Sequence, residues 1–590
     1  MVAAVIAAVV LARMVVSLRG YLVADDFAFR YWAATQPLGY DYLFQSYGGH
    51  VNPIGLLNQW ILQALFPGSH IALVLFTTAL TLAAFGFMAW MVWDITERIV
   101  GPIVVVLMMG TLLFGLESYL WWAASIYAAP YLLFTCAGAF FVVRWLRSGR
   151  DRWIWVAVCC AVAASFSFSR GFMAIVLMFI VAAAVPVRRG GALGPLAAWR
   201  SKPTAWLSMT AGATLAVILV LVNSARISRD GFSWLALPRY FWNLLIFNVF
   251  PAIWGGPWRW FEIPGQVWTP VTANPAPAWW AVWLFVGLTA TATVFLVIRR
   301  PDLRWLTAGT WVFTMLVLLV AALARSGTAV ESVAYRYTFD VVLPVALLFT
   351  LAVVPVRWRK SGTSRIGLVI VAAVVASAVL STLVPARAWM SNLAKPYMAN
   401  AVNGFERIPA GQVVLNQGVP FDLIHPGLMA PYASAEVVMT PQPGAPAFGD
   451  VASDKLFGFA SDGTVQEQDV EGPGSVPGPD PDCGYRVTNA PRTIPLQGDL
   501  IAWDFYARVA YFSERGGTLN LAVGGVIHTV PLQPGGLRAV YFRVNGPGSD
   551  VLVSSGTPGA TVCVTELRIG NRVGMQSREL VPLPVNRLAE

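Results

Sequence analysis

Long apolar stretches alternate with short polar loops over the first two thirds of the chain. A helix needs roughly 20 apolar residues to cross a bilayer, and most of these stretches approach that length. The pattern predicts an α-helical polytopic membrane protein with about 11 transmembrane helices in a module at 1–385. The apolar runs lie at 2–18, 71–93, 102–116, 126–143, 153–168, 172–187, 204–222, 278–298, 305–323, 338–356 and 366–384.

The pattern changes after residue 385. Residues 386–463 mix a surface helix with strand-like pieces such as 436–439, so we expect a small mixed α/β extracytoplasmic subdomain there. Residues 464–482 are acidic and rich in Pro and Gly, which predicts a linker.

The last segment, 483–590, alternates apolar and polar residues with the period of a strand. Gly524-Gly525 separates two such stretches, which is a hairpin signal. We therefore expect a C-terminal extracytoplasmic β-sandwich domain.

Composition supports this division. The chain has 590 residues, of which 57% are hydrophobic and 12% charged, so a water-soluble enzyme is excluded as a class. The net charge of +10 does not indicate nucleic-acid binding, because the basic residues lie in short loops between apolar runs.

The basic loops predict the orientation. Lys and Arg concentrate in alternate short loops, which by the positive-inside rule are cytoplasmic: 94–101, 144–152, 187–202, 299–304 and 357–365. We therefore expect a multi-pass plasma-membrane protein with a cytoplasmic N-terminus. The loop after the first run and everything beyond 385 are then extracytoplasmic.

Two long outward loops, 19–70 and 223–277, are rich in aromatic residues. This is typical of helices that lie in the membrane interface, and both loops can roof a cavity at the outer leaflet. The alternative is an aromatic belt that only anchors the helices.

Cysteine usage agrees with an extracytoplasmic tail. Cys483 and Cys563 are the only pair in the outer domain, and an oxidising compartment favours a disulfide between them. The sequence contains no Cys/His spacing suited to zinc and no phosphate-cradling glycine loop.

Two adjacent acids, Asp25 and Asp26, follow the first apolar run directly. A charge near the bilayer is costly, which indicates a purpose, and we interpret one of the two as a catalytic base. Neighbouring helical side chains point in different directions, so we favour Asp25 as the base, with Asp26 in a structural hydrogen bond or assisting. The alternative is a helix N-cap or an interfacial turn.

Four short motifs in this context resemble the GT-C superfamily of polyprenyl-phosphate-sugar glycosyltransferases, and in particular its actinobacterial, arabinofuranosyltransferase-like set. They are Ala24-Asp25-Asp26-Phe27, Gly49-His50-Val51-Asn52-Pro53, Tyr335-Arg336-Tyr337 with Asp340, and the segment 478–485. The resemblance implies a GT-C-like membrane module with its active site at the outer face. It also implies that an acid of the first outer loop is the base.

Several further residues are candidates for binding the donor phosphate or the substrates: His50, Asn52, Glu117, Arg170, Arg336, Tyr337 and Asp340. Guanidinium groups suit phosphate, and Asp340 is expected to pair with Arg336 and orient it. The alternatives are local: a turn histidine, a helix-end carboxylate and arginines that snorkel to lipid headgroups.

The leading hypothesis is an inverting glycosyltransferase that moves a sugar from a polyprenyl-phosphate donor to a hydroxyl of a cell-envelope glycan or lipid. The alternatives are a flippase or transporter of lipid-linked sugar, and a non-catalytic envelope scaffold with a glycan-binding tail. For that tail, the stacking candidates are Trp503, Tyr506, Tyr511 and Tyr541. We expect no cofactor, although two adjacent acids can hold a divalent metal, and no nucleic-acid partner.

Overall fold

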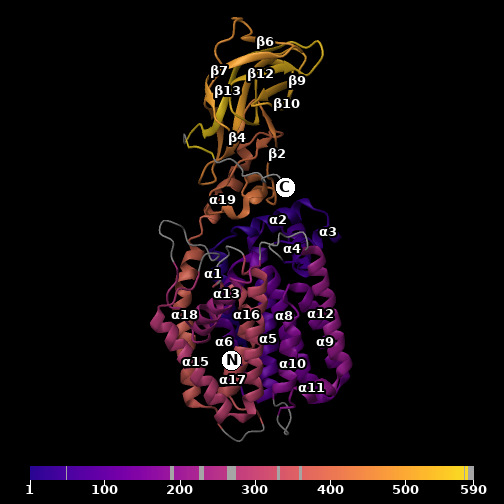
Figure 1. Ribbon diagram of the computed structural model, residues 1–590, viewed down its shortest axis with the longest axis vertical. Helices are drawn as coiled ribbons and strands as arrows, with labels where there is room; N and C mark the ends of the chain where they lie inside the picture. The colour runs from indigo at the N-terminus through magenta and orange to yellow at the C-terminus, as the bar shows by residue number, and fades with distance from the viewer. Residues whose placement is uncertain are drawn as a thin grey trace. The chain divides into compact units, whose positions relative to one another are not determined.

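The protein folds into two compact units in a computed structural model (Figure 1). The helical unit comprises residues 1–22 and 35–392, and the C-terminal unit comprises residues 23–34 and 393–590. The structure describes residues 1–47, 50–185, 192–224, 232–261, 274–327, 333–357, 362–576 and 579–581. The main boundary therefore lies near residue 392, close to the expected 385, but a short N-terminal segment belongs to the C-terminal unit.

Each of the eleven apolar runs falls on helical structure. The helices that carry them are α1 (Val2–Arg19), α5 (His70–Thr96), α6 (Val100–Thr111), α8 (Trp122–Ser148), α9 (Asp151–Ser167), α10 (Met173–Ala184), α12 (Pro203–Ser224), α15 (Trp279–Arg299), α16 (Arg304–Arg325), α17 (Val342–Val353) and α18 (Arg365–Met390).

Among the described residues, seven helices are long and apolar enough to cross a membrane. There are eight if α6 and the segment after it, bent by 52°, form one span. This is fewer than the expected eleven because α9, α10 and α17 have only 17, 12 and 12 residues.

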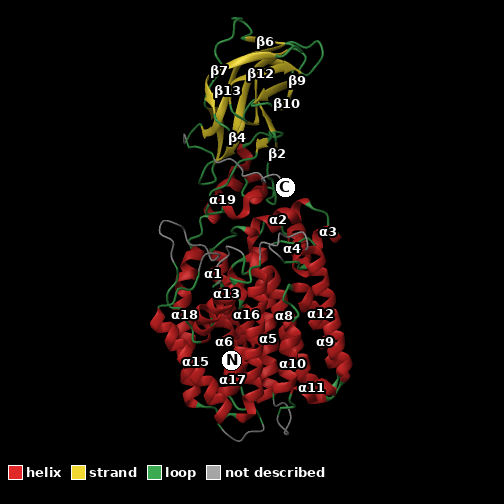
Figure 2. Cartoon of the chain, in the orientation of Figure 1, coloured by secondary structure: helices red, strands yellow, loops and turns green. Residues whose placement is uncertain are grey.

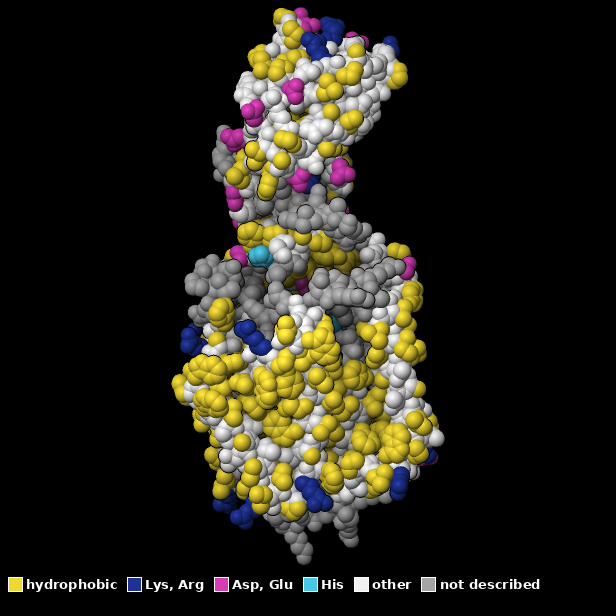
Figure 3. Space-filling model, in the orientation of Figure 1, with side chains coloured by type: hydrophobic (Ala, Val, Ile, Leu, Met, Phe, Trp, Pro, Cys, Tyr) yellow, Lys and Arg dark blue, Asp and Glu magenta, His cyan; other side chains and the backbone are white. Residues whose placement is uncertain are grey.

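The surface of the helical unit is apolar. In Figure 3, hydrophobic side chains dominate the face of this unit that is shown. On α15, Trp283 and Ile298 are each 68% exposed, an exposure that lipid tolerates and water does not. The chain is therefore a multi-pass membrane protein.

Shorter elements connect the long helices. They are α3 (Tyr40–Leu43), α4 (Pro53–Leu65), η1 (Leu113–Gly115), α7 (Leu116–Leu120), α11 (Pro195–Ser201), α13 (Leu237–Asn243), the π-helix η3 (Leu244–Val249), α14 (Phe250–Ile253), η5 (Pro301–Leu303), η6 (Tyr335–Tyr337) and η7 (Phe339–Val341).

The tryptophans of the second aromatic loop bond to neighbouring helices. Trp254 Nε1 donates to Thr289 on α15, while Trp258 Nε1 and Trp260 Nε1 donate to Ser377 Oγ and the Ser381 carbonyl on α18. These three rings therefore anchor the loop to the bundle. Residues 262–273 of the expected loop lie outside the described residues.

Helix α8 runs between two polar clusters. Its 27 residues span about 40 Å. Near its start, Tyr127 stacks on His50, and in its last turns Arg144 and Arg147 pair with Asp94 at 2.8 and 2.9 Å. The residues from a predicted outer loop and those from the predicted cytoplasmic loops therefore lie at opposite ends of α8.

The C-terminal unit contains two large β-sheets and a small parallel sheet of β1 and β2 (Figure 2). A four-stranded sheet has the order β10-β9-β12-β7, and a larger sheet has the order β3-β11-β8-β13-β5-β4 with β6 paired to β13; both enclose one apolar core. The strands are β1 (Val414–Leu415), β2 (Phe448–Gly449), β3 (Val451–Ser453), β4 (Leu456–Phe459), β5 (Val465–Glu471), β6 (Tyr485–Val487), β7 (Arg492–Leu500), β8 (Asp504–Ser513), β9 (Gly517–Val523), β10 (Val526–Leu532), β11 (Gly535–Asn545), β12 (Gly548–Ser555) and β13 (Val562–Gly574).

The hairpin prediction is correct. Strands β9 and β10 pair antiparallel with Val523 opposite Val526, and Gly524 and Gly525 between them have φ of 55° and 86°. Two consecutive positive φ angles are the requirement of a tight hairpin turn, and glycine meets it without steric cost.

Two local predictions in the C-terminal unit are wrong. The expected linker 464–482 contains β5, which pairs with β4 and β13, so it joins the sheet instead of separating domains. The expected strand at 436–439 is part of a helix that buries Val437 and Val438 together. The helical elements here are α19 (Ala394–Gly404), η8 (Phe405–Arg407), α20 (Pro426–Met429), η9 (Ala430–Tyr432) and α21 (Ala435–Met439).

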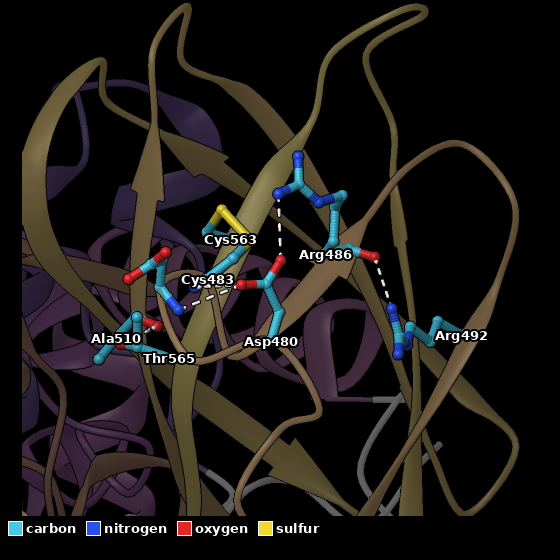
Figure 4. The surroundings of a disulfide bond; sticks show 8 residues. Asp480, Cys483, Arg486, Arg492, Ala510, Cys563 and Thr565 are labelled. Carbon is cyan, nitrogen blue, oxygen red and sulfur yellow. Dashed lines mark hydrogen bonds and ion pairs between the residues drawn. A yellow bond between two sulfur atoms is a disulfide. The ribbon is translucent and has the colours of Figure 1, made fainter.

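Cys483 and Cys563 form a disulfide, with 4.8 Å between their Cα atoms (Figure 4). Cys563 lies on β13, and Cys483 follows Asp480, whose Oδ1 accepts the Cys483 N–H at 3.2 Å. The bond therefore fastens the turn before β6 to the last strand.

The expected stacking aromatics are mostly core. Tyr506, Tyr511 and Tyr541 are 0%, 1% and 6% exposed, so their rings face protein and cannot serve as platforms for sugars. Only Trp503 of the four is exposed, at 57%.

Candidate functional site

Seven of the nine expected catalytic and substrate-binding residues lie in the helical unit, and the acid pair lies in the C-terminal unit. Six of the seven come together at the end of the bundle where α8 begins. Arg325, which was not predicted, lies with them. We call these seven residues the cationic cluster: His50, Glu117, Arg170, Arg325, Arg336, Tyr337 and Asp340.

The turn that carries Arg336 is fixed by Glu117. This carboxylate is 1% exposed; its Oε1 accepts the Tyr335 N–H at 3.0 Å, and its Oε2 is 2.9 Å from Arg336 Nη1. The Arg336 guanidinium also lies over the Trp121 ring, 5.5 Å from its centroid. Both the backbone and the side chain of the turn therefore depend on one buried acid.

Arg170 holds the same turn from another side. It donates to the carbonyls of Tyr337 and Arg336 at 2.5 and 3.5 Å and lies 3.6 Å from Asp340. The expected partner was wrong: Asp340 pairs with Arg170 and not with Arg336. A turn of 3₁₀ helix separates Arg336 from Asp340, and the carboxylate points away from its sequence neighbour into the protein, where it is 0% exposed.

The π-helix η3 is hydrogen-bonded to residues on both sides of this turn. Asn248 of η3 donates to the Val333 carbonyl at 2.8 Å and accepts from the Thr338 hydroxyl at 2.6 Å. Single π-helical turns often occur at functional sites, where the extra residue redirects a side chain. The side chain of Tyr337 lies beside Tyr240, with 6.3 Å between the ring centroids.

His50 is held between a hydroxyl and a guanidinium. Its Nδ1 lies 2.7 Å from Ser169 Oγ, and its Nε2 lies 3.2 Å from Arg325 Nη2. Arginine can only donate, so Nε2 accepts and Nδ1 carries the proton, which makes the imidazole neutral. Burial first, and then the charges of Arg325, Arg170 and Arg336, hold the pKa of His50 well below its usual value.

The described residues of the cationic cluster include three arginines and two carboxylates, Glu117 and Asp340. The hydrogen bonds of His50 make its imidazole neutral. The aromatic rings of Tyr127 and Phe168, stacked 4.9 Å apart, form an apolar wall beside His50. Such a setting attracts an anion with an apolar substituent.

Asn52 stands apart from these contacts. It is the N-cap residue of α4, its side chain is 4% exposed, and its Oδ1 has no hydrogen-bond partner among the described residues. Gly49 of the motif at 49–53 lies outside the described residues.

The acid pair opens helix α2 (Asp25–Thr35) in the C-terminal unit. Asp26 is 0% exposed, and its Oδ2 accepts the Val23 N–H at 2.9 Å. This bond satisfies a helix N-terminal donor, the role of the acid in a capping box. Asp25 is partly exposed beside it and adds a second negative charge at the helix N-terminus.

The sequence predicted interfacial helices in the loop 19–70. Helix α2 of this loop is instead mostly buried in protein. Almost every residue from Asp26 to Ala33 is buried. Within the C-terminal unit, Trp32 packs on Tyr432 with 5.6 Å between the rings, and Tyr31 donates to Glu436 at 3.3 Å. Its aromatic residues are therefore used for packing within a protein core.

Arg325 and Ser169 are the members of this site that the sequence reasoning missed. Arg325 ends α16, so an arginine closing an apolar run on the predicted outer side was the available signal. Ser169 precedes Arg170 directly and had no signal of its own. Among the described residues, His, Cys, Asp and Glu side chains form no group of three or more that is suited to a metal ion.

Comparison with known proteins gives structural likenesses only. No family model and no curated protein sequence matches the chain. Three solved structures are similar at low identity, the first being the arabinosyltransferase EmbB from Mycobacterium smegmatis, with 12% identity and a TM-score of 0.33 over 97% of this chain and 65% of that one. The chain thus spans about 65% of the length of EmbB.

The second structure is ArnT from Cupriavidus metallidurans bound to undecaprenyl phosphate, with 12% identity and a TM-score of 0.39 over 77% of this chain and 92% of that one. The third is the mycobacterial arabinofuranosyltransferase AftD, with 10% identity and a TM-score of 0.37 over 98% of this chain and 59% of that one.

Proposed function

We propose that this protein is a membrane glycosyltransferase that uses a polyprenyl-phosphate sugar as donor and acts on the outer face of the plasma membrane. The observation that carries the proposal is the cationic cluster, which is held by buried acids at one end of a membrane-embedded bundle. A lipid phosphate is an anion with an apolar chain, so it matches both the charge and the setting.

In this proposal the arginines divide the work. Arg170 and Arg336 are braced by Asp340 and Glu117 at 3.6 and 2.9 Å and keep the turn 335–340 rigid. Arg325, at a helix end and bonded to neutral His50, offers guanidinium donors to the phosphate. As the sugar leaves, negative charge grows on the phosphate, so fixed cations stabilise the transition state more than the ground state.

The acceptor hydroxyl needs a base, and we propose Asp25. Its neighbour Asp26 accepts a hydrogen bond from the Val23 N–H, so in this proposal Asp26 has the structural role. Attack by the activated hydroxyl on the anomeric carbon from the face opposite the phosphate inverts the configuration. No protein acid is required, because the phosphate departs as an anion.

Transfer assays with purified protein and a panel of polyprenyl-phosphate sugars test the assignment. We expect Asp25→Asn to lower turnover by about 10²-fold or more, the size of a lost general base, without changing the thermal unfolding temperature. Asp550→Asn, an exposed acid on β12, is the matched control. Full turnover in Asp25→Asn would reject the role of Asp25.

Donor binding is tested separately. Arg325→Gln should raise the KM for the donor by about tenfold or more while the protein still folds. Since we predict no metal, EDTA should leave turnover unchanged, and a loss that Mg²⁺ or Mn²⁺ restores would overturn that part. A flippase is favoured instead if labelled lipid-linked sugar crosses liposomes at equal rates with wild type and Asp25→Asn.

A further inference from the structure

A second polar cavity lies inside the helical unit and shares no residue with the cationic cluster. Its empty volume is about 490 Å³, which includes the space at its opening to solvent. It is enclosed where α1 and α18 end and α5 begins, with α7 and α8 behind it. The polar residues among its lining are Arg13, Ser17, His70, Thr77, Thr78, Thr81, Tyr119 and Ser125.

Three buried groups that can donate hydrogen bonds line this cavity and have no partner among the residues that the structure describes. They are Arg13 Nη1, Thr81 Oγ1 and Trp389 Nε1. Thr81 and Trp389 are only 2% and 1% exposed, so bulk water does not satisfy them. Each unmade bond costs about 1–3 kcal/mol, and three around one space indicate a missing acceptor.

Three other hydroxyls of the lining donate to backbone carbonyls. Ser17 donates to the Tyr119 carbonyl at 3.2 Å, and Ser125 and Thr78 donate to carbonyls of their own helices. These three groups therefore do not need an acceptor in the cavity.

The cavity also lacks an anion of its own. Its lining contains Arg13 and no Asp or Glu. The Arg13 guanidinium lies over the Tyr119 ring, 3.7 Å from the centroid, which offsets only part of the cost of a charge within a transmembrane helix. A bound anion would offset the remainder.

We propose that this cavity binds the phosphate group of a membrane phospholipid. An arginine fork with hydroxyl and indole donors suits phosphate oxygens. The inner space that admits a water-sized group is about 30 Å³, enough for one or two oxygens, so the rest of the headgroup stays at the mouth. On α1, Leu11 and Val15 are 49% and 45% exposed and lie on the face opposite Arg13, so that face is apolar.

The test measures lipid retention by the full chain. Purified protein is titrated with phosphatidylglycerol and, separately, with inorganic phosphate, and bound lipid is counted by native mass spectrometry. We expect wild type to retain one phosphatidylglycerol that Arg13→Gln binds at least about tenfold more weakly. Arg387→Gln, an exposed arginine near the same end of α18, is the matched control for general attraction to anionic headgroups and should match wild type.

Further variants keep the test independent of folding defects. Thr81→Val removes one donor at nearly constant volume and should weaken retention about threefold to tenfold, with unchanged unfolding temperature. Trp389→Phe also removes one donor and should weaken retention by a similar factor, but it leaves a cavity that lowers the unfolding temperature. Equal retention in wild type, Arg13→Gln and Thr81→Val would overturn the proposal. Displacement of the lipid by millimolar inorganic phosphate would overturn the lipid as the occupant in favour of a free anion.

Discussion

At the scale of single residues, the cationic cluster shows how much the effect of a charged group depends on its partner. Arg170, Arg325 and Arg336 are the same residue type at one end of one bundle. Two of them are braced by carboxylates, while the contact of the third with His50 holds a neutral imidazole in one tautomer. The two carboxylates fix the geometry of the turn that carries Arg336.

His50 gives a prediction about pH. Its folded-state pKa lies well below its usual value, so between about pH 6.5 and that lowered pKa the unfolded chain binds a proton that the native protein does not. The free energy of unfolding should therefore decrease as the pH is lowered through this window, by about 1.4 kcal/mol per pH unit at most. Thermal unfolding at pH 7.5 and 5.5 measures the drop.

The control for this prediction is His50→Gln, which keeps a donor and an acceptor without a titrating group. Its pH dependence should be smaller than that of wild type by the contribution of His50. Identical slopes in the two proteins would show that other groups cause the drop.

The residue types of this site could be predicted from the sequence, but the pairing could not. Charged residues next to apolar runs are visible in the sequence, and so Glu117, Arg170 and Arg336 were found. Which acid meets which arginine depends on the path of the turn 335–340, and the local pattern gives no information about that path. For this reason the sequence predicted an ion pair of Asp340 with Arg336, whereas Asp340 pairs with Arg170.

At the scale of elements, the turn between α9 and α10 positions Arg170 through a glycine. A Cβ on Gly171 would overlap the Ala164 carbonyl oxygen and the Ser165 Cα of α9, which are backbone atoms that cannot rotate away. Gly171→Ala should therefore displace Arg170, lower transfer by about tenfold or more and cost about 1–3 kcal/mol of stability. Gly287→Ala on α15 meets nothing within 4 Å and is the matched control.

The disulfide gives the second prediction at this scale. It closes a loop of 80 residues, and in the chain-entropy model such a bond stabilises by about 4 kcal/mol. Replacing both Cys483 and Cys563 by Ser should lower the urea midpoint of the C-terminal unit, followed by the near-ultraviolet signal of its buried tyrosines. An unchanged midpoint would mean that the sheets alone set its stability.

Elements were predictable where one strong periodicity decided them. The apolar runs became helices because in lipid the backbone must satisfy its own hydrogen bonds. The β9–β10 hairpin followed from alternation and two glycines. Strand β5 was missed because Val465–Glu471 alternates weakly and is acidic. Its strand conformation comes from pairing with β4, just before it, and with β13, which is far later in the sequence.

At the scale of the whole molecule, the two polar ends of the bundle predict a testable orientation. The Arg144 and Arg147 end should face the cytoplasm, and the cationic cluster the outside. Single cysteines placed at Arg150 and at Asn520 on β9 can be probed in intact cells with a membrane-impermeant maleimide. We expect labelling at 520 only until the membrane is permeabilised, and the reverse pattern would invert the topology.

The membership of α2 in the C-terminal unit has a consequence for biosynthesis. The helix that carries Asp25 packs against Tyr432 and Glu436, which are translated some four hundred residues after it. This helix therefore cannot bury its aromatic side chains in this way until those residues have been made. We expect a polypeptide truncated before them to keep the proposed base on an unpacked segment.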